Sequence, residues 1–210
     1  MTVVAIDGPS GSGKSTVART LAARLGLEYL DTRAMYRSVA FAALQRGLDP
    51  LDADLMSKLA QEIDLVTDGP NVVVDGYDAS IEIRGPEVTK AVSLVAAHPG
   101  VRTELVSRQR EWIRERGGGV VEGRDIGSEV WPDAELKVYL TADLSVRAAR
   151  RKEEMAAEDR QEVAEDLVRR DTYDSTRAAS PLRRADDAVV IDTTDMTVED
   201  IVDALLARLP

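Results

Sequence analysis

The feature that most constrains the fold of this chain is a glycine-rich segment at residues 8–15, which fits the pattern G-x-x-x-x-G-K-[ST] without a mismatch. A short β-branched stretch at residues 3–6 precedes it, and Val17, Leu21 and Leu25 follow at helical spacing, with Gly26 as the expected helix cap. In a strand–loop–helix of this kind, backbone N–H groups and the helix N-terminus surround a phosphate. We therefore predict a nucleoside triphosphate site formed by Gly8, Pro9, Ser10, Gly11, Ser12, Gly13, Lys14, Ser15 and Thr16.

Two side chains of this segment have chemistry that suits a triphosphate. Lys14 can reach the β- and γ-phosphate oxygens, and the Ser15 hydroxyl can bind Mg²⁺ directly. The alternative is a glycine-rich turn that only connects two elements. A phosphate loop does not by itself separate kinases from GTPases or motor ATPases, so the rest of the chain must decide the class.

Composition excludes several classes of protein. With 210 residues the chain can form one large domain or a domain with an insert, and its 44% hydrophobic and 31% charged residues are typical of a globular protein. No apolar run approaches the ~20 residues of a membrane-spanning helix. A net charge of −11 argues against general nucleic-acid binding. The absence of cysteine excludes a thiolate nucleophile and suits a reducing cytoplasm, and the first strand begins so early that we expect no signal peptide.

Apolar patterning predicts five short strands that alternate with helices, and hence an α/β fold with a parallel sheet covered on both faces. The expected strands lie at residues 3–6, 28–30, 120–122, 136–140 and 189–191. The expected helices follow the phosphate loop and occupy residues 34–46, 52–63, 86–97, 99–116, 144–157, 162–173 and 195–209, the last with a capping box at 197–200. Glycines 117–119 are expected to break the helix before them.

One region interrupts this alternation. Short β-like pieces at 65–66, 71–74 and 79–81 are separated by turn residues, which predicts a small antiparallel meander with the helices 86–97 and 99–116 packed behind it. We expect a single domain over 1–210, with a core of 1–62 and 117–210, an insert of 63–116 and a helical lid at about 147–162.

Arginine, whose fixed fork of donors suits phosphate, recurs where a second anion would bind. Ligands of parallel sheets bind beyond the carboxyl ends of the strands, and Asp31-Thr32 and the segment 122–125 both occupy such ends. For any one arginine the alternative is a solvated helix face. Ser93, on an otherwise apolar helix face, is either a satisfied core hydroxyl or a ligand contact. The arginines that we consider for the site are Arg37, Arg102, Arg124, Arg147, Arg150, Arg151, Arg170 and Arg177.

Four segments together resemble the bacterial cytidylate kinases, a family of phosphate-loop nucleoside monophosphate kinases. They are the phosphate loop, Asp31-Thr32 with 34–37, the sequence EGRDIG at 122–127, and RDTYDSTR at 170–177. The resemblance covers nearly the whole chain and includes the inserted meander. It implies transfer of the γ-phosphoryl group of ATP to CMP or dCMP with Mg²⁺, in pyrimidine metabolism in the cytoplasm. It also implies a monomer with no nucleic-acid or membrane partner.

The resemblance also implies roles for individual residues. Thr32, Arg37, Arg124 and Arg177 are similar to the residues that hold the monophosphate, and Arg170 and Asp174 to the ribose contacts. Ser93, Arg102 and Asp125 are similar to the residues that recognise cytosine. The base chemistry agrees, because a carboxylate accepts from the cytosine amine and donors suit N3 and O2. The catalytic set would be Lys14, Arg124, Arg150, Arg151 and Arg177, with Glu122 near the water shell of the metal.

Arg33 departs from the family pattern, which has glycine at this position. If the position requires a positive φ, arginine is strained there; otherwise it supplies an extra phosphate donor or points to solvent.

Two rival functions remain for a chain with a phosphate loop. A GTP-dependent switch needs an [NT]-K-x-D motif, and none is present. A kinase for another monophosphate, or for a hydroxyl acceptor, is the nearer rival.

Overall fold

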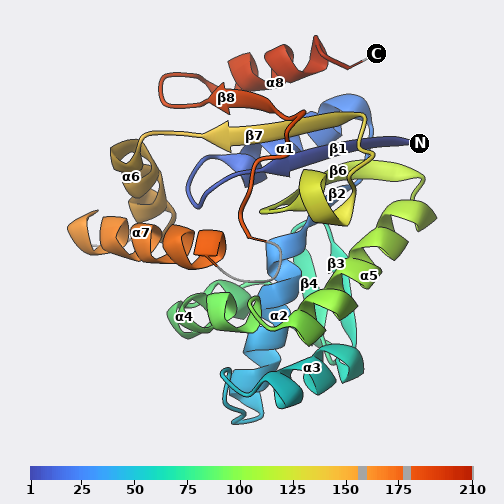
Figure 1. The fold of residues 1–210 in the computed structure, drawn as a ribbon, viewed down its shortest axis with the longest axis vertical. Coiled ribbons are helices and arrows are strands. Elements are labelled where there is room, and N and C mark those ends of the chain that lie inside the picture. Colours follow the sequence, from blue (N-terminus) through green and yellow to red (C-terminus); the bar gives the residue numbers. More distant parts are fainter. Residues whose placement is uncertain (156–159, 177–180, 210) are drawn as a thin grey trace. The chain divides into compact units, whose positions relative to one another are not determined.

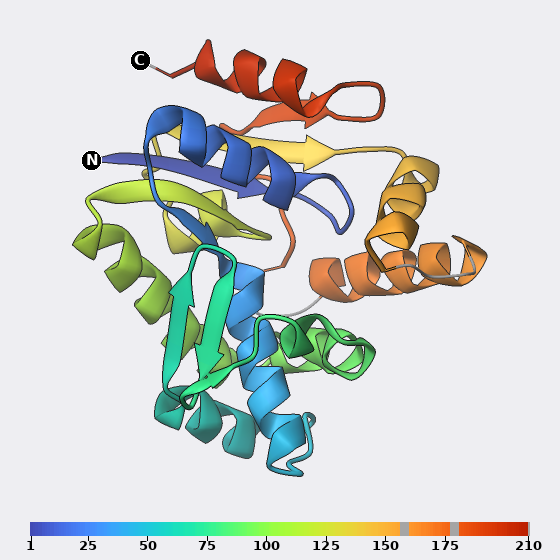
Figure 2. The ribbon, with the colours of Figure 1, turned by 180° about the vertical axis from the view of Figure 1, so that it is seen from behind.

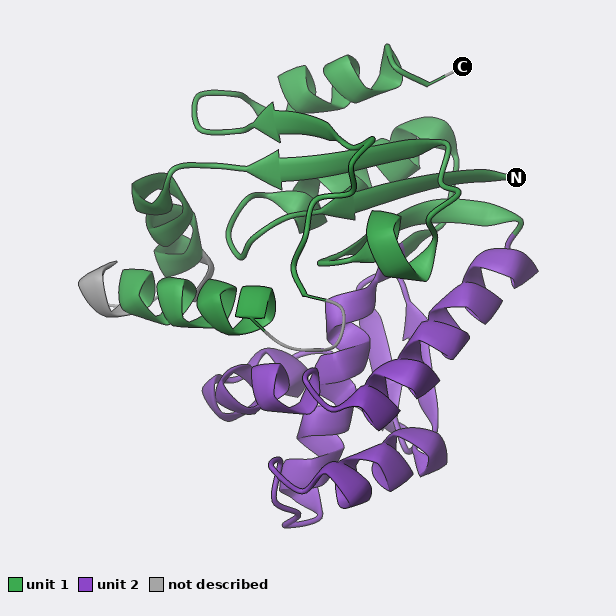
Figure 3. Ribbon diagram, viewed as in Figure 1, with its two compact units in different colours: residues 1–29, 117–210 green, residues 30–116 purple. Residues whose placement is uncertain are grey.

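The structure, a computed structural model, describes residues 1–155, 160–176 and 181–209, and divides into two compact units. The first unit combines residues 1–29 with 117–210, and the second is the continuous segment 30–116 (Figure 3). The sequence predicts an insert that begins at residue 63, whereas the second compact unit begins at residue 30. The boundary falls earlier because α2 (Thr32–Gln45) and α3 (Ala53–Glu62) pack against α4 (Pro86–Val95) and α5 (Pro99–Glu115) of the second unit.

The core of the molecule is the five-stranded parallel sheet that the sequence predicts. Its strands are β1 (Thr2–Asp7), β2 (Tyr29–Asp31), β6 (Gly118–Gly123), β7 (Leu136–Thr141) and β8 (Val189–Asp192), in the order β2-β6-β1-β7-β8. β1 lies in the centre, pairing in parallel with β6 on one side and β7 on the other. Residues 3–7 of β1 and all of β6 are buried, which explains the apolar runs at 3–6 and 120–121.

Helices of the first unit are arranged around this sheet. α1 (Lys14–Leu25) and α8 (Val198–Leu206) cover one face and share a core with β1, β6 and β7 (Figure 2). The short π-helix η2 (Ile126–Val130) lies on the opposite face. α6 (Leu144–Met155) and α7 (Arg160–Thr176) lie beyond the carboxyl end of β7 (Figure 1). Among the described residues, no helix has the length and apolar character needed to cross a bilayer.

In the second unit, α2 is the central element. α4 packs on α2, α5 packs on α3, and the antiparallel sheet of β3 (Leu65–Asp68), β4 (Asn71–Val74) and β5 (Tyr77–Asp78) lies against α2 (Figure 2). The expectation that the two helices 86–97 and 99–116 lie behind the meander is therefore wrong, because α2 fills that place. The meander itself is confirmed, except that its third strand is at 77–78. Residues 79–81 instead lead into the short 3₁₀ helix η1 (Glu82–Arg84).

The breaking of the helix before glycines 117–119 is confirmed, since α5 ends at Glu115, but two further sequence expectations need correction. β6 begins at Gly118 rather than at residue 120, and Gly118 has a φ of +131° where a Cβ would lie 2.2 Å from the carbonyl oxygen of Thr2. The glycine allows β6 to run close beside β1. The last helix begins at Val198, because Thr197 and Asp200 form the predicted capping box and so fix its N-terminus.

Candidate active site

The phosphate-loop segment lies between β1 and α1, as the sequence predicts, with Gly13 as the N-cap of α1 and Lys14 as its first residue. Gly8 has a φ of +148°, and a Cβ there would lie 2.1 Å from the carbonyl oxygen of Leu140 in β7. Only glycine allows the chain to pass so close to β7. The Ser12 hydroxyl donates to the Pro9 carbonyl oxygen at 3.0 Å, which braces the loop from within.

Lys14 is buried, and its ammonium group donates to the Pro9 carbonyl oxygen at 2.7 Å. Burial, together with the nearby positive charge of Arg124, lowers the pKa of Lys14 to about 7, while Glu122, Asp171 and Asp7 act in the opposite direction. A lysine with such a pKa has a charge that responds strongly to an added anion. This is the electrostatic setting of a phosphate-binding group.

Asp7, at the end of β1, is a site residue that the sequence analysis missed. Its carboxylate accepts hydrogen bonds from the backbone N–H groups of Ile126 (2.8 Å) and Gly127 (2.9 Å), directly after Asp125. Burial raises the pKa of Asp7 to about 7, although the two N–H bonds act against this shift. The carboxylate therefore fixes the backbone of the segment that carries Arg124 and Asp125.

Arg124 joins three parts of the first unit. Its Nη2 donates to the Ser10 hydroxyl at 2.7 Å, and its Nε donates to Asp174 of α7 at 3.1 Å. Both Arg124 and Asp174 are buried, so this ion pair is shielded from water. The structure thus brings together Ser10, which the sequence assigns to ATP, and Arg124 and Asp174, which the family resemblance assigns to CMP.

Glu122 lies in β6, two residues before Arg124, and is buried. One of its carboxylate oxygens accepts a hydrogen bond from the hydroxyl of Tyr29 in β2. Tyr29 was not among the predicted site residues. It fixes the direction of the carboxylate that the sequence assigned to the metal's water shell.

The two helices α6 and α7 hold the backbone of Ser10. Arg147 of α6 donates to the Ser10 carbonyl oxygen at 3.0 Å and also pairs with Asp171 of α7, which accepts from the Ser10 N–H at 3.1 Å. Arg151 is a half-buried residue of α6. Arg170 is buried in α7, and its Nη1 lies 3.8 Å from Oδ2 of Asp166. Arg177 falls outside the described residues.

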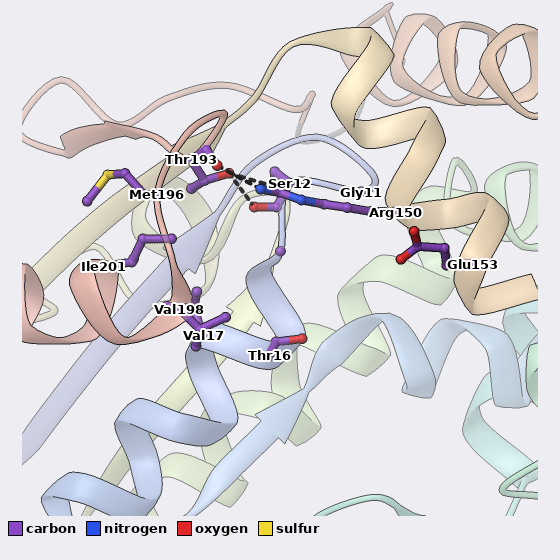
Figure 4. Close-up of a pocket in the computed structure, with 11 residues that line it drawn as sticks. Gly11, Ser12, Thr16, Val17, Arg150, Glu153, Thr193, Met196, Val198 and Ile201 are labelled. Carbon is purple, nitrogen blue, oxygen red and sulfur yellow. Dashed lines mark hydrogen bonds between the residues drawn. The ribbon is translucent and has the colours of Figure 1, made fainter. Parts of the chain in front are cut away.

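Arg150 of α6 points to the loop that follows β8. Its Nη1 donates to the Thr193 hydroxyl at 2.9 Å and its Nη2 to the Thr193 carbonyl oxygen at 2.7 Å. The Thr193 hydroxyl in turn donates to the Ser12 carbonyl oxygen at 3.2 Å (Figure 4). Thr193 therefore connects the phosphate loop with α6, a contact across 181 positions that no local pattern predicts.

A pocket of about 250 Å³ opens beside the phosphate loop within the first unit. Arg150 and Thr193 lie at one side, and Glu153 of α6 also faces the pocket (Figure 4). An apolar wall with backbone polar groups at its edge suits a flat aromatic ring. The remaining lining residues are Gly11, Ser12, Gly13 and Thr16 of the loop and α1, and the apolar residues Val17, Met196, Val198 and Ile201.

The second unit carries its own group of predicted site residues. Thr32 is the first residue of α2, where Asp31 caps the helix by accepting from the Ala34 N–H. Arg37, one turn further, donates to the carbonyl oxygen of Ile83 at 2.7 Å and to the Thr89 hydroxyl at 3.0 Å. These contacts hold a buried guanidinium near the N-terminal end of the helix.

Ser93 and Arg102 complete this group of predicted site residues in the second unit. The guanidinium of Arg102 lies 5.6 Å from the centre of the Tyr36 ring, a cation–π arrangement. Arg33 donates to the Ser93 hydroxyl at 2.9 Å. Arg33 is helical, and within the described residues only Asp75 among non-glycine residues has a positive φ, so the alternative of backbone strain at Arg33 is excluded.

Comparisons with known proteins identify the family of this chain. The cytidylate kinase family model matches residues 4–210. A cytidylate kinase of Mycobacterium avium is 50% identical over 211 residues, which cover 97% of this chain and 92% of that protein. A cytidylate kinase of Rhodococcus opacus is 50% identical, with 97% and 93% covered. A gluconokinase structure from Sinorhizobium meliloti, at 14% identity, has the same fold with a TM-score of 0.52 and coverage of 99% and 90%.

The loop between β1 and α1, the buried lysine and the arginines at the strand ends define a nucleotide kinase of the phosphate-loop class. The match of the family model over nearly the whole length places it more narrowly. The chain belongs to the cytidylate kinase family.

Proposed function

We propose that the protein transfers the γ-phosphoryl group of ATP to CMP, with dCMP also accepted, giving the nucleoside diphosphate and ADP. The observation that carries this proposal is the buried pair of cations, Lys14 and Arg124, in direct contact with the phosphate loop. Family membership supports the choice of acceptor.

ATP binds with its phosphates in the loop 8–15 and its base in the pocket beside that loop. The pocket supports this placement because it adjoins Gly11 and Gly13 and has an apolar wall that includes Val17 and Met196. Thr193 and Arg150 together line one side of this pocket, and the hydrogen bond between them joins the edge of the pocket to α6.

Mg²⁺ accompanies ATP. The residues present fit this ion: Ser15 is an exposed hydroxyl at the start of α1, and Glu122 is a carboxylate held by Tyr29. Among the described residues there is no group of three or more acidic or histidine side chains that could hold a metal alone, which suits an ion that binds mainly phosphate oxygens and water. Ser15 would bind the ion directly and Glu122 through water, and the ion would neutralise charge on the transferred group.

CMP binds through the residues that the family resemblance implies. Thr32, Arg37, Arg124 and Arg177 hold its phosphate, while Arg170 and Asp174 contact the ribose. Ser93, Arg102 and Asp125 recognise cytosine, because Asp125 accepts from the amine and the other two donate to N3 and O2. Uracil has a carbonyl where cytosine has the amine, so a carboxylate at that position opposes it.

Transfer itself needs no strong general base, because the acceptor phosphate is already an anionic nucleophile. The protein aligns the two phosphates and neutralises charge as the bond to ADP breaks. Lys14, Arg124 and Arg177 contribute positive charge, together with Arg150 and Arg151 of the lid at about 147–162.

A substrate panel tests the proposal. The purified protein is assayed with MgATP and CMP, dCMP, UMP, AMP or shikimate, and ADP release is measured. We expect CMP and dCMP to be the best acceptors. A higher kcat/KM for AMP or shikimate than for CMP would overturn the proposal.

Arg177→Ala should raise KM for CMP and lower kcat together, since a phosphate clamp acts in both ground and transition states.

A further inference from the structure

Two arginines of α2 pair with two hydroxyls of α4 inside the second unit. Arg33 donates to Ser93 at 2.9 Å, and Arg37, four residues later, donates to Thr89, four residues before Ser93, at 3.0 Å. The spacing puts both arginines on one stripe of α2 and both hydroxyls on one stripe of α4. The Arg33–Ser93 contact is thus part of a regular interface between the helices rather than an isolated surface contact.

The hydroxyl of Ser93 differs from other helical hydroxyls in where its proton goes. Five helical hydroxyls donate to the carbonyl oxygen four residues earlier: Ser38, Ser57, Thr103, Ser175 and Thr176. Ser93 is only 7% exposed, yet among the described residues its sole hydrogen bond is the one that it accepts from Arg33. A buried hydroxyl with an unused proton lacks part of its hydrogen bonding, and a ligand can supply the missing acceptor.

Arg33 controls the direction of that proton. The guanidinium N–H occupies one lone pair of the Ser93 oxygen, and its positive charge turns the hydroxyl hydrogen away from the guanidinium. Without the arginine, a serine hydroxyl rotates freely and acts as donor or acceptor. With it, Ser93 is held in the orientation of a donor.

We propose that Arg33 is a specificity-determining positioning residue that fixes Ser93 as a hydrogen-bond donor to N3 of the acceptor base. This inference rests on the proposed function and deepens it. N3 of cytosine is an acceptor, so it matches the Ser93 donor, whereas N3 of uracil carries a hydrogen and opposes it. Arg33 therefore favours cytosine over uracil without touching the base.

The test is a double-mutant cycle with kcat/KM for CMP and for UMP as the measured quantities. Arg33→Met keeps the bulk of the side chain and removes its donors, and Ser93→Ala removes the hydroxyl. Arg46→Met is the matched control, because Arg46 is an exposed residue at the opposite end of α2. Arg33→Lys retains a positive donor. Circular dichroism and Tm establish that each variant is folded.

We expect Arg33→Met to lower the CMP/UMP ratio about tenfold. In the Ser93→Ala background the same substitution should change the ratio by less than about twofold, because the two residues act as a unit. Arg33→Lys should restore most of the ratio, and Arg46→Met should leave it unchanged.

Multiplicative effects of the two substitutions, or an unchanged ratio in Arg33→Met, would overturn the role of Arg33. A wild-type protein that phosphorylates neither pyrimidine nucleotide would instead refute the proposed function itself. The two failures are therefore distinct.

Discussion

The ammonium group of Lys14 donates to the carbonyl oxygen of Pro9, five residues earlier in the same loop, at 2.7 Å. A bound phosphate competes with this carbonyl for the ammonium protons. Because the pKa of Lys14 is lowered to about 7, part of the lysine is neutral near neutral pH. An anion favours the charged form, so its arrival raises this pKa.

We therefore predict that binding of MgATP takes up close to one proton at about pH 8 and close to none at about pH 6. Calorimetry in two buffers with different ionisation enthalpies measures the uptake. Lys14→Arg is the control, since arginine keeps its charge at both values of pH and should show no uptake. Uptake that persists in Lys14→Arg would assign the proton to another group.

Asp125→Ala removes the proposed acceptor of the cytosine amine. A charge-assisted hydrogen bond contributes about 1.5–3 kcal/mol, so kcat/KM for CMP should fall about 10- to 150-fold. UMP has no amine to lose, so its kcat/KM should hold or rise. Equal losses for both substrates would show that Asp125 has a structural or catalytic role and that cytosine is recognised elsewhere.

Asp7→Asn tests the carboxylate that anchors Ile126 and Gly127. The pKa of Asp7 is raised from 3.8 to about 7, so between these values the folded protein holds a proton that the unfolded chain releases. The stability that this proton contributes is complete below the lower value and is lost as the pH rises through the upper one. In Asp7→Asn the side chain does not titrate, so the variant lacks this pH-dependent contribution to stability.

The free energy of unfolding of the wild type, relative to Asp7→Asn, should accordingly fall by about 2 kcal/mol between about pH 4.5 and pH 6.5. Urea unfolding at the two values of pH measures the difference. A difference that rises with pH would mean that the two backbone bonds dominate over burial.

Thr193→Val removes the hydroxyl that joins Ser12 to Arg150 and keeps the shape of the side chain. We expect KM for ATP to rise about fivefold, because the variant loses the hydrogen bonds of this hydroxyl to Arg150 and to Ser12. KM for CMP should change little. Thr67→Val, in β3 of the second unit, is the matched control and should leave both unchanged. An equal change for CMP would contradict a role restricted to the donor nucleotide.

Local sequence signals predict much of this fold and only part of the site. The phosphate loop and the five strands are predicted because their spacing and β-branched runs are short-range patterns. The start of α2 is misplaced by two residues, since the cap formed by Asp31 depends on its own backbone angles. The strand character of Gly118 is missed because it arises from the approach of Thr2, a contact far away in the sequence.

The unpredicted site residues share the same cause. Asp7 acts on Ile126 and Gly127 across about 120 positions, and Thr193 reaches Ser12 across 181. None of these pairs has a spacing that a helix or strand repeat would reveal. Arg33 and Ser93 could each be singled out from the sequence, but the contact between them could not, since 60 residues separate them.

The central position of β1 also has a consequence for synthesis on the ribosome. Both of its neighbours, β6 and β7, are made more than a hundred residues later, so β1 has no strand to pair with until the second unit has been translated. The continuous segment 30–116 can meanwhile close its own contacts. We expect nascent chains to become protease-resistant in that segment first, and the nucleotide-binding loop to gain its shape only when the last third of the protein emerges.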